Sequence, residues 1–236
     1  MRVVSAQVTT WKQDLAFEVE RFSLLWRYQH HIPPFALWWR LVLKRVVDLL
    51  VALTALILLA PVMAAVALLI ALDSKGPVLF LQERMGLLGR AFTMYKFRTM
   101  MHHAEAATGP VWAMVGEDPR VTRLGCFLRR THMDELPQLF NVLKGDMSLV
   151  GPRPERPCFV NELERAIPRY EHRLYVKPGM TGLAQVHYRY DQTMADVQKK
   201  LRFDLLYVKR MCLMLDARIV VWTLFVVITG RGIVKS

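Results

Sequence analysis

Two carboxylates and three basic side chains crowd into one short stretch of this chain. The stretch runs from Leu128 to Pro154, and its polar cluster consists of Arg129, Arg130, His132, Asp134 and Glu135. Two ionised carboxylates side by side repel each other unless a cation lies between them, and Mg²⁺ prefers a few carboxylates together with phosphate oxygens. Arginines beside such a pair can neutralise phosphate oxygens as charge develops in phosphoryl transfer. The residue types therefore favour a site for a metal ion and a phosphate.

A helix that follows the carboxylates would set their electrostatics. Pro137 is tolerated only in the first turn of a helix, so we expect the helix to begin near Asp134 and to end at Gly145. Both carboxylates then lie at the positive end of the helix dipole, which favours the ionised form that a nucleophile or a metal ligand needs. The alternative is structural: Asp134 only caps the helix and Glu135 is exposed to solvent. This stretch alone does not decide between the two.

Further cations are placed so that they could join this site. Arg129 precedes the carboxylate pair by five residues, and Arg153 lies in a Gly-Pro-Arg-Pro turn whose prolines stiffen the backbone. Lys96 and Arg98 end an expected strand, where the period of two places them on one face. That face is either solvated or part of a shared anion site, and the second reading requires other cations to converge on it.

An uncharged run of 24 residues, Leu49–Leu72, is long enough to span the hydrocarbon core of a bilayer. Pro61 near its centre removes a backbone donor and predicts a kink. Basic residues flank the run on both sides, and such flanks favour the cytoplasmic side of a membrane. A re-entrant helix, which bends at Pro61 and returns through the same leaflet, is therefore favoured over a helix that spans the bilayer.

The rest of the sequence predicts an α+β fold that is mostly α-helical. Residues 78–82 and 92–98 have the composition of short strands, and the glycines between them predict a β-hairpin. Helices are expected over residues 121–130, 158–167 and 191–214.

Composition narrows the class of partner. The net charge is +12 and the pI is about 10.0, so anionic partners are expected: nucleic acid, phosphorylated small molecules or acidic lipid. The hydrophobic fraction of 53% is high for so charged a chain and favours a membrane-associated protein over a soluble nucleic-acid binder. The segment Phe22–Trp39 is rich in aromatic and basic residues, which suits the headgroup region of a bilayer. A core helix of a soluble protein could have the same composition.

The order of these motifs resembles that of the bacterial sugar transferase family, the monotopic polyprenyl-phosphate phosphoglycosyltransferases. The resemblance covers Lys44 to about Gly232 and includes the proline-centred apolar run. It rests on the segments KRxxD at 44–48, GPV at 76–78, QxRxG at 82–86, KFRTM at 96–100, DELPQ at 134–138, SLVGPRP at 148–154 and KPGMTG at 177–182.

This resemblance implies an activity and a role for each site residue. Asp134 would attack the β-phosphate of a UDP-sugar, expel UMP and hold a covalent phosphosugar, which polyprenyl phosphate then accepts. Asp134 and Glu135 would bind Mg²⁺. The phosphate-binding and substrate-binding cations would be Lys96, Arg98, Arg129 and Arg153.

The resemblance also implies a location and a division of the chain. The enzyme would lie in the bacterial inner membrane, with its catalytic domain on the cytoplasmic face against inner-leaflet anionic lipid. We expect an N-terminal interfacial segment (1–39), a re-entrant membrane helix (40–73) and a cytosolic catalytic domain with C-terminal interfacial helices (74–236). A homodimer through the C-terminal helices is a further expectation.

Two other functions compete with this one. A non-catalytic basic scaffold at the membrane surface explains the charge and the apolar run, but not the Asp-Glu pair or the stiffly held Arg153. A nucleic-acid-binding protein is disfavoured because the basic residues are dispersed among motifs and no recognised binding module is present. No nucleic-acid partner is therefore expected.

Overall fold

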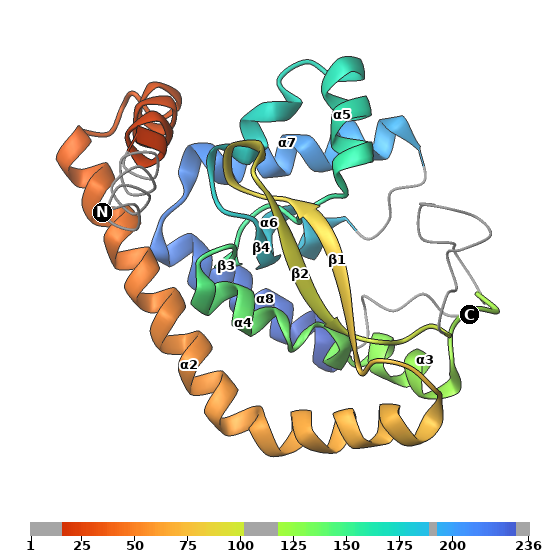
Figure 1. The fold of residues 1–236 in the computed structure, drawn as a ribbon. Coiled ribbons are helices and arrows are strands. Elements are labelled where there is room, and N and C mark those ends of the chain that lie inside the picture. Colours follow the sequence, from red (N-terminus) through yellow and green to blue (C-terminus); the bar gives the residue numbers. More distant parts are fainter. Residues whose placement is uncertain (1–15, 102–117, 189–192, 230–236) are drawn as a thin grey trace, which may run out of the picture.

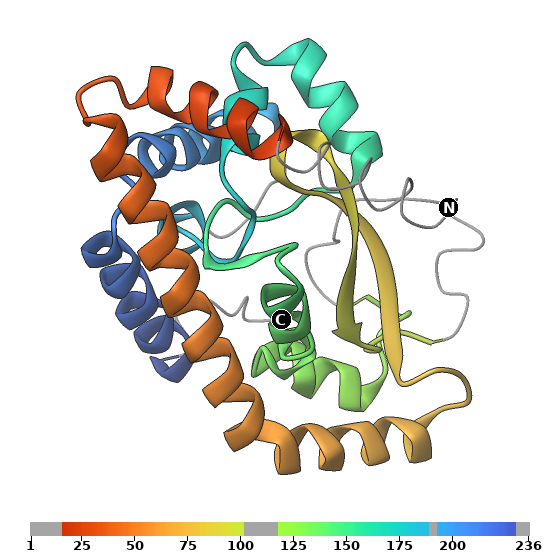
Figure 2. The same ribbon diagram turned by 60° about the vertical axis from the view of Figure 1, so that its left-hand side comes forward.

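A single long helix, α2 (Pro34–Asp73), brackets two sides of the protein. The computed structural model describes residues 16–101, 118–188 and 193–229 (Figure 1). The 40 residues of α2 begin at a proline, which suits the first turn of a helix, and contain Pro61 in the interior. Figures 1 and 2 both show the helix bending between two arms, as expected where a proline removes a backbone hydrogen bond.

The other elements form a mostly helical body with two small sheets, so the predicted α+β, mostly α composition is confirmed. A helix over residues 16–28 precedes α2. After α2 the elements are β1 (Leu79–Met85), η1 (Leu87–Gly89), β2 (Ala91–Phe97), α3 (Arg123–Arg130), η2 (Met133–Glu135), α4 (Gln138–Lys144), β3 (Ser148–Val150), α5 (Pro157–Ala166), η3 (Tyr170–Tyr175), β4 (Gly179–Thr181), α6 (Leu183–His187), α7 (Met194–Arg210) and α8 (Leu213–Thr229).

Local sequence predicts one of the two sheets and not the other. Strands β1 and β2 pair antiparallel from Leu79↔Phe97 to Met85↔Ala91, which confirms the predicted hairpin. Strands β3 and β4 pair in parallel, through Ser148↔Gly179. This second sheet was not predicted, because each strand has only three residues and its partner lies far along the chain.

The C-terminal helices depart from the prediction of one helix over residues 191–214. The helix α7 ends at Arg210, Met211 leaves the helical region at ψ 121°, and α8 begins at Leu213. Residues 191 and 192 lie outside the described residues. The uncharged, mostly apolar residues 219–229 therefore form the C-terminal part of α8, a helix of 17 residues that begins at Leu213.

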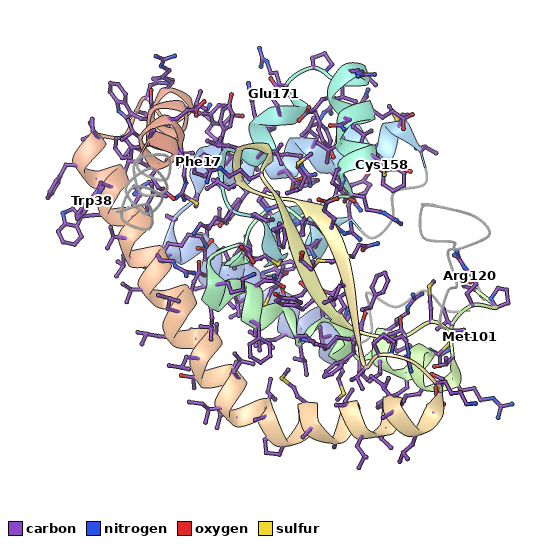
Figure 3. All side chains as sticks on the ribbon, in the orientation of Figure 1. Phe17, Trp38, Met101, Arg120, Cys158 and Glu171 are labelled. Carbon is purple, nitrogen blue, oxygen red and sulfur yellow. The ribbon has the colours of Figure 1, made fainter. Side chains whose placement is uncertain are left out.

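Few residues of α2 pack against the body. Its buried positions are Leu37, Asp48, Ala52, Val66 and Ile70. Many large apolar side chains on the helix are exposed instead, and Figure 3 shows side chains such as Trp38 pointing away from the body. Within the described part of the chain, α2 is the one helix whose length and composition would allow it to cross a membrane. Its insertion, re-entrant or spanning, stays a prediction.

Three polar contacts tie the first arm of α2 to the body. The Lys44 ammonium lies 2.7 Å from the Asp216 carboxylate on α8. The Arg45 guanidinium donates to the carbonyls of Val142 and Leu143 at the end of α4, where a cation complements the helix dipole. The Asp48 carboxylate accepts from the Leu149 N–H in β3. The charged residues before the apolar run therefore fix the position of α2 against the body.

The segment before α2 is packed into the core. Leu25 and Ile32 lie in a buried cluster with Val150, Tyr207 and Val208. At the other end of the same segment, the Arg90 guanidinium of the hairpin turn stacks over the Phe17 ring. The helix α2 starts at Pro34, ahead of the boundary predicted at residue 40, and residues 1–15 of the first predicted segment lie outside the described residues.

The tie between Lys44 and Asp216 makes a prediction about stability. The two side chains are only 12% and 10% exposed, so replacing Lys44 with methionine leaves a nearly buried carboxylate without its cation. We expect Lys44→Met to destabilise the fold by about 3 kcal/mol. Thermal unfolding of the detergent-solubilised protein measures the effect.

Lys144→Met is the matched control, because its ion pair with Asp146 is 54% exposed on the lysine side. Its loss should cost less than about 1 kcal/mol. Equal shifts in the unfolding midpoint for the two variants would contradict the structural role of Lys44.

Candidate active site

The two adjacent carboxylates lie on a tight turn between α3 and α4. Asp134 and Glu135 belong to the 3-10 turn η2, whose backbone bonds join Glu135 to His132 and Leu136 to Met133. The expectation that a helix begins near Asp134 is wrong, because α4 begins at Gln138 and Pro137 takes the position before it. The predicted end at Gly145 is confirmed, since that glycine adopts φ 95° and closes α4.

Glu135 is the centre of a charge cluster built from three elements. Its Oε1 atom lies 2.8 Å from the Lys96 ammonium on β2 and 2.8 Å from the Arg153 guanidinium in the turn after β3. Burial alone would raise the pKa of this carboxyl, but the charges and hydrogen bonds of Arg153 and Lys96 outweigh it and hold the pKa well below its usual range. Glu135 is therefore an ionised carboxylate with both cations bound.

Asp134 has the opposite electrostatic balance. The residue is 8% exposed, and its carboxylate makes no hydrogen bond within the described part of the chain. Burial and the negative charge of Glu135 raise its pKa, and the charges of Lys96, Arg153 and Arg129 only partly oppose them. Burial and Glu135 therefore act against the ionisation that the expected helix dipole would favour at Asp134. Of these two neighbours in sequence, one carboxylate is thus paired with cations and the other makes no hydrogen bond within the described residues.

The predicted cations divide into two groups. Lys96 and Arg153 converge on Glu135, and Arg129 acts on Asp134 electrostatically while its Nε donates to the Thr99 hydroxyl at 3.0 Å. Other cations therefore do converge with Lys96, as the shared-site interpretation required, and the binding of an anion there stays a prediction.

Arg98 is not brought to the carboxylates. The strand β2 ends at Phe97, and the Arg98 guanidinium donates to the carbonyls of Ser74 and Pro77, both at 2.6 Å. It is 7% exposed and binds the chain just beyond the end of α2. The expectation that Lys96 and Arg98 share an anion-binding face is therefore wrong, because free carbonyls after a helix offer Arg98 a local partner.

The turn that bears Arg153 is held by an unusually close approach of two backbones. A Cβ on Gly151 would lie 2.4 Å from the Lys177 carbonyl oxygen, and one on Gly179 would lie 2.1 Å from the Gly151 nitrogen. Only glycine allows the two segments to pair this closely. The parallel bridge between β3 and β4 depends on this contact, which holds the GPRP and KPGMTG segments side by side.

The residues present suit a magnesium ion of the kind that substrate phosphates complete. No group of three or more His, Cys, Asp or Glu side chains gathers anywhere in residues 16–101, 118–188 and 193–229, so a cage made of protein ligands alone is absent there. Asp134 and Glu135 supply two carboxylates beside three cations. Mg²⁺ commonly takes one or two carboxylates and leaves its other positions to water and phosphate oxygens.

Sequence reasoning missed the residues that support this cluster. Asn141 in α4 accepts from the Tyr95 N–H and donates to the Thr93 carbonyl, and so fixes the strand that carries Lys96. Arg173 donates to the Arg153 carbonyl. Asn141 lies between the marked motifs and Arg173 lies outside them, and no local pattern points to either contact.

Comparison with known proteins places this geometry in a family. A sequence model described as "Bacterial sugar transferase" matches residues 39–230. The UDP-N-acetylgalactosamine-undecaprenyl-phosphate N-acetylgalactosaminephosphotransferase of Aeromonas hydrophila is 47% identical over 190 residues, which are 80% of this chain and 44% of that protein. The UDP-glucose:undecaprenyl-phosphate glucose-1-phosphate transferase of Xanthomonas campestris pv. campestris is 45% identical over 184 residues, or 77% of this chain and 38% of that protein.

A third relative is similar in length to this chain. The exopolysaccharide production protein PSS of Rhizobium leguminosarum bv. phaseoli is 44% identical over 202 residues, which are 81% of this chain and 98% of that protein. The chain thus spans less than half of the first two relatives and nearly all of the third. Because the family model covers most of the sequence, including the whole carboxylate and cation cluster, the chain belongs to the bacterial sugar transferase family.

Proposed function

We propose that this protein transfers a sugar-1-phosphate from a UDP-sugar to polyprenyl phosphate, giving polyprenyl-diphospho-sugar and UMP. The observation that carries the proposal is the position of the buried Asp134, next to the Lys96–Glu135–Arg153 cluster and without a hydrogen bond of its own in the described part of the chain. Family membership and the activities named for the relatives support it. The similar identities to a glucose enzyme and an N-acetylgalactosamine enzyme favour neither sugar, so the tests below use a panel of UDP-sugars.

The proposed reaction has two displacements at phosphorus. An Asp134 oxygen attacks the β-phosphorus of the UDP-sugar, and the bond between that phosphorus and the bridging oxygen breaks as UMP departs. An oxygen of polyprenyl phosphate then attacks the same phosphorus and releases the aspartate. Burial without a hydrogen-bonding partner leaves the carboxylate poorly stabilised, and a poorly stabilised anion is the better nucleophile.

The cations have a separate task in this reaction. Lys96, Arg129 and Arg153 lie close enough to act on the two carboxylates, and they would neutralise the diphosphate as charge builds on its oxygens. Glu135 keeps Lys96 and Arg153 together before the substrate arrives, so that little rearrangement is needed. Mg²⁺, held by Asp134 and Glu135, would supply further neutralisation of the phosphate oxygens.

The proposed location is the bacterial inner membrane, with the catalytic body on its cytoplasmic face. The exposed apolar side chains of α2, together with Trp38 and Trp39 near its start, suit a helix in lipid with aromatic anchors in the headgroups. Anionic lipid of the inner leaflet would attract a protein with a net charge of +12. A homodimer through the C-terminal helices stays a prediction.

Replacing the nucleophile tests the reaction itself. Asp134→Asn should lower UMP release from a UDP-sugar in nanodiscs by at least about 1,000-fold, because an amide cannot form the phosphosugar bond. Mass spectrometry of the unmodified protein, quenched with donor alone, should show the sugar-phosphate adduct.

Asp73→Asn is the control, since Asp73 is an exposed residue at the C-terminal end of α2 that the proposed reaction does not use. Unchanged turnover of Asp134→Asn would refute the nucleophile. Absence of UMP for every UDP-sugar, with lipid binding intact, would favour the non-catalytic scaffold.

Replacing Glu135 tests the metal proposal. Glu135→Gln removes the charge that holds Lys96 and Arg153 and removes one proposed ligand, so the Mg²⁺ concentration for half-maximal UMP release should rise at least about tenfold. Glu162→Gln on the exposed side of α5 is the control. An identical magnesium titration for Glu135→Gln and the parent protein would count against the ligand role.

The re-entrant helix is tested by labelling from each side of the membrane. Single cysteines at Arg40 and Lys75, in a background without the three native cysteines, mark the two flanks of the apolar run. Both should react with a membrane-impermeant maleimide from the cytoplasmic side alone. Reaction of one flank from the periplasm would instead establish a spanning helix.

A further inference from the structure

We propose that Arg173 is a positioning residue, which acts on the reaction by fixing the backbone that carries Arg153. The inference rests on the proposed role of Arg153 at the substrate phosphate. It assigns a function to a buried ion pair that no part of the proposed chemistry uses.

The ion pair joins η3 to α7 and ends on the Arg153 backbone. The Arg173 Nε lies 2.9 Å from the Asp204 Oδ2, and one terminal nitrogen lies 2.8 Å from the same oxygen. That terminal nitrogen also donates to the Arg153 carbonyl at 2.9 Å, and the other one donates to the Tyr170 hydroxyl. Arg173 is 6% exposed and Asp204 is 3% exposed, so neither is screened by water.

The bond to Arg153 is part of a larger brace on the turn. Four consecutive carbonyls, from residue 152 to residue 155, each accept a hydrogen bond from a different residue of the protein. The donors, in the order of the carbonyls, are the Gly179 N–H, the Arg173 guanidinium, the Arg84 guanidinium and the Met85 N–H. Main-chain pairing supplies the first and last bonds, whereas the middle two depend on arginine side chains, of which Arg173 is buried and Arg84 is partly buried.

The side chain of Arg153 needs such a brace. It is 40% exposed, and among the described residues its side chain pairs with Glu135 alone, so its own contacts restrain it weakly. A guanidinium can bind a phosphate in two-pronged fashion only when its base is held in place, since displacement by about 1 Å can cost on the order of 100-fold in rate. The position of the turn therefore decides whether Arg153 reaches the phosphate.

The charges around Arg173 support a fixed arrangement. Burial by itself would lower the pKa of Arg173, but the nearby Tyr170, Asp204 and Glu155 reverse that effect and raise the pKa above its usual range. The guanidinium stays charged, and its planar array of N–H groups matches a carboxylate and a carbonyl at the same time. Replacing Arg173 with lysine keeps the charge but removes the planar array of N–H groups. That substitution therefore tests geometry separately from charge.

A second contact from α7 supports the same segment. The Tyr207 hydroxyl donates to the Val150 carbonyl at 2.9 Å. Tyr207 follows Asp204 by three residues, so both lie on one face of α7. This face therefore acts on the chain directly before the turn and, through Arg173, on the turn itself.

The test is a double-substitution cycle on UMP release in nanodiscs. Arg173→Lys alone should lower kcat/KM for the UDP-sugar on the order of 100-fold, with much of the loss in kcat. In a background of Arg153→Lys, which keeps a cation but shortens its reach, the same substitution should cost less than about threefold, because residues that act as a unit are not additive. Affinity for UDP with Mg²⁺, measured by calorimetry, repeats the cycle without turnover.

Two further variants keep the result interpretable. Glu171→Gln changes an exposed residue of the same turn η3, seen at the top of Figure 3, and should leave the rate unchanged. Asp204→Asn retains the guanidinium but removes its carboxylate partner, and it replaces Arg173→Lys in the cycle if that variant does not fold.

The outcomes separate this inference from the proposed function. Equal fold-losses from the Arg173 change in the parent and in the Arg153→Lys background would overturn the positioning role while leaving the reaction intact. A normal rate for Arg153→Lys and Arg153→Ala would instead overturn the phosphate role of Arg153 and, with it, the basis of this inference.

Discussion

The site is organised by a shared carboxylate oxygen. Lys96 and Arg153 both lie 2.8 Å from the Glu135 Oε1, and without that oxygen two positive charges would face each other with no anion between them. Because the attraction weakens with separation, the strand, the turn and η2 must meet within a few ångströms. Much of the surrounding structure serves this meeting: Asn141 fixes the hairpin, and the glycine pair of β3 and β4 fixes the turn.

The same constraint explains why adjacent carboxylates have different chemistry. Glu135 accepts from both cations, and their charges hold its pKa low despite burial. Burial and the negative charge of Glu135 oppose the ionisation of Asp134, so its pKa is raised. A pair of titratable groups whose environments drive their pKa values apart is a common sign of divided roles. One residue is suited to organise cations, and the other is suited to react.

Features that depend on residues close together in the sequence could be predicted, and those that depend on distant residues could not. The hairpin, the end of α4 at Gly145 and the proline inside α2 depend on neighbours in the chain, and all were predicted. The convergence of Lys96 and Arg153 was suggested by motif order, but its centre on Glu135 was not. Two features of the site could not be read from local sequence. The Arg98 guanidinium donates to carbonyls just after α2, and burial raises the pKa of Asp134. Arg173 and Asp204 are 31 residues apart and unite only in three dimensions.

The apolar helix and the chemistry are joined by polar contacts, and this has a physical reason. The exposed apolar side chains give α2 no fixed orientation relative to the body, because apolar contact is non-directional. Direction comes from Lys44, whose ammonium binds Asp216, and from the Tyr207 hydroxyl, which contacts both Asp216 and the Val150 carbonyl. A continuous set of buried bonds thus leads from α2 to the residue before the GPRP turn. If α2 lies in the membrane as proposed, these bonds hold Arg153 at a constant height above the lipid, where a phosphate on a polyprenyl chain must be met.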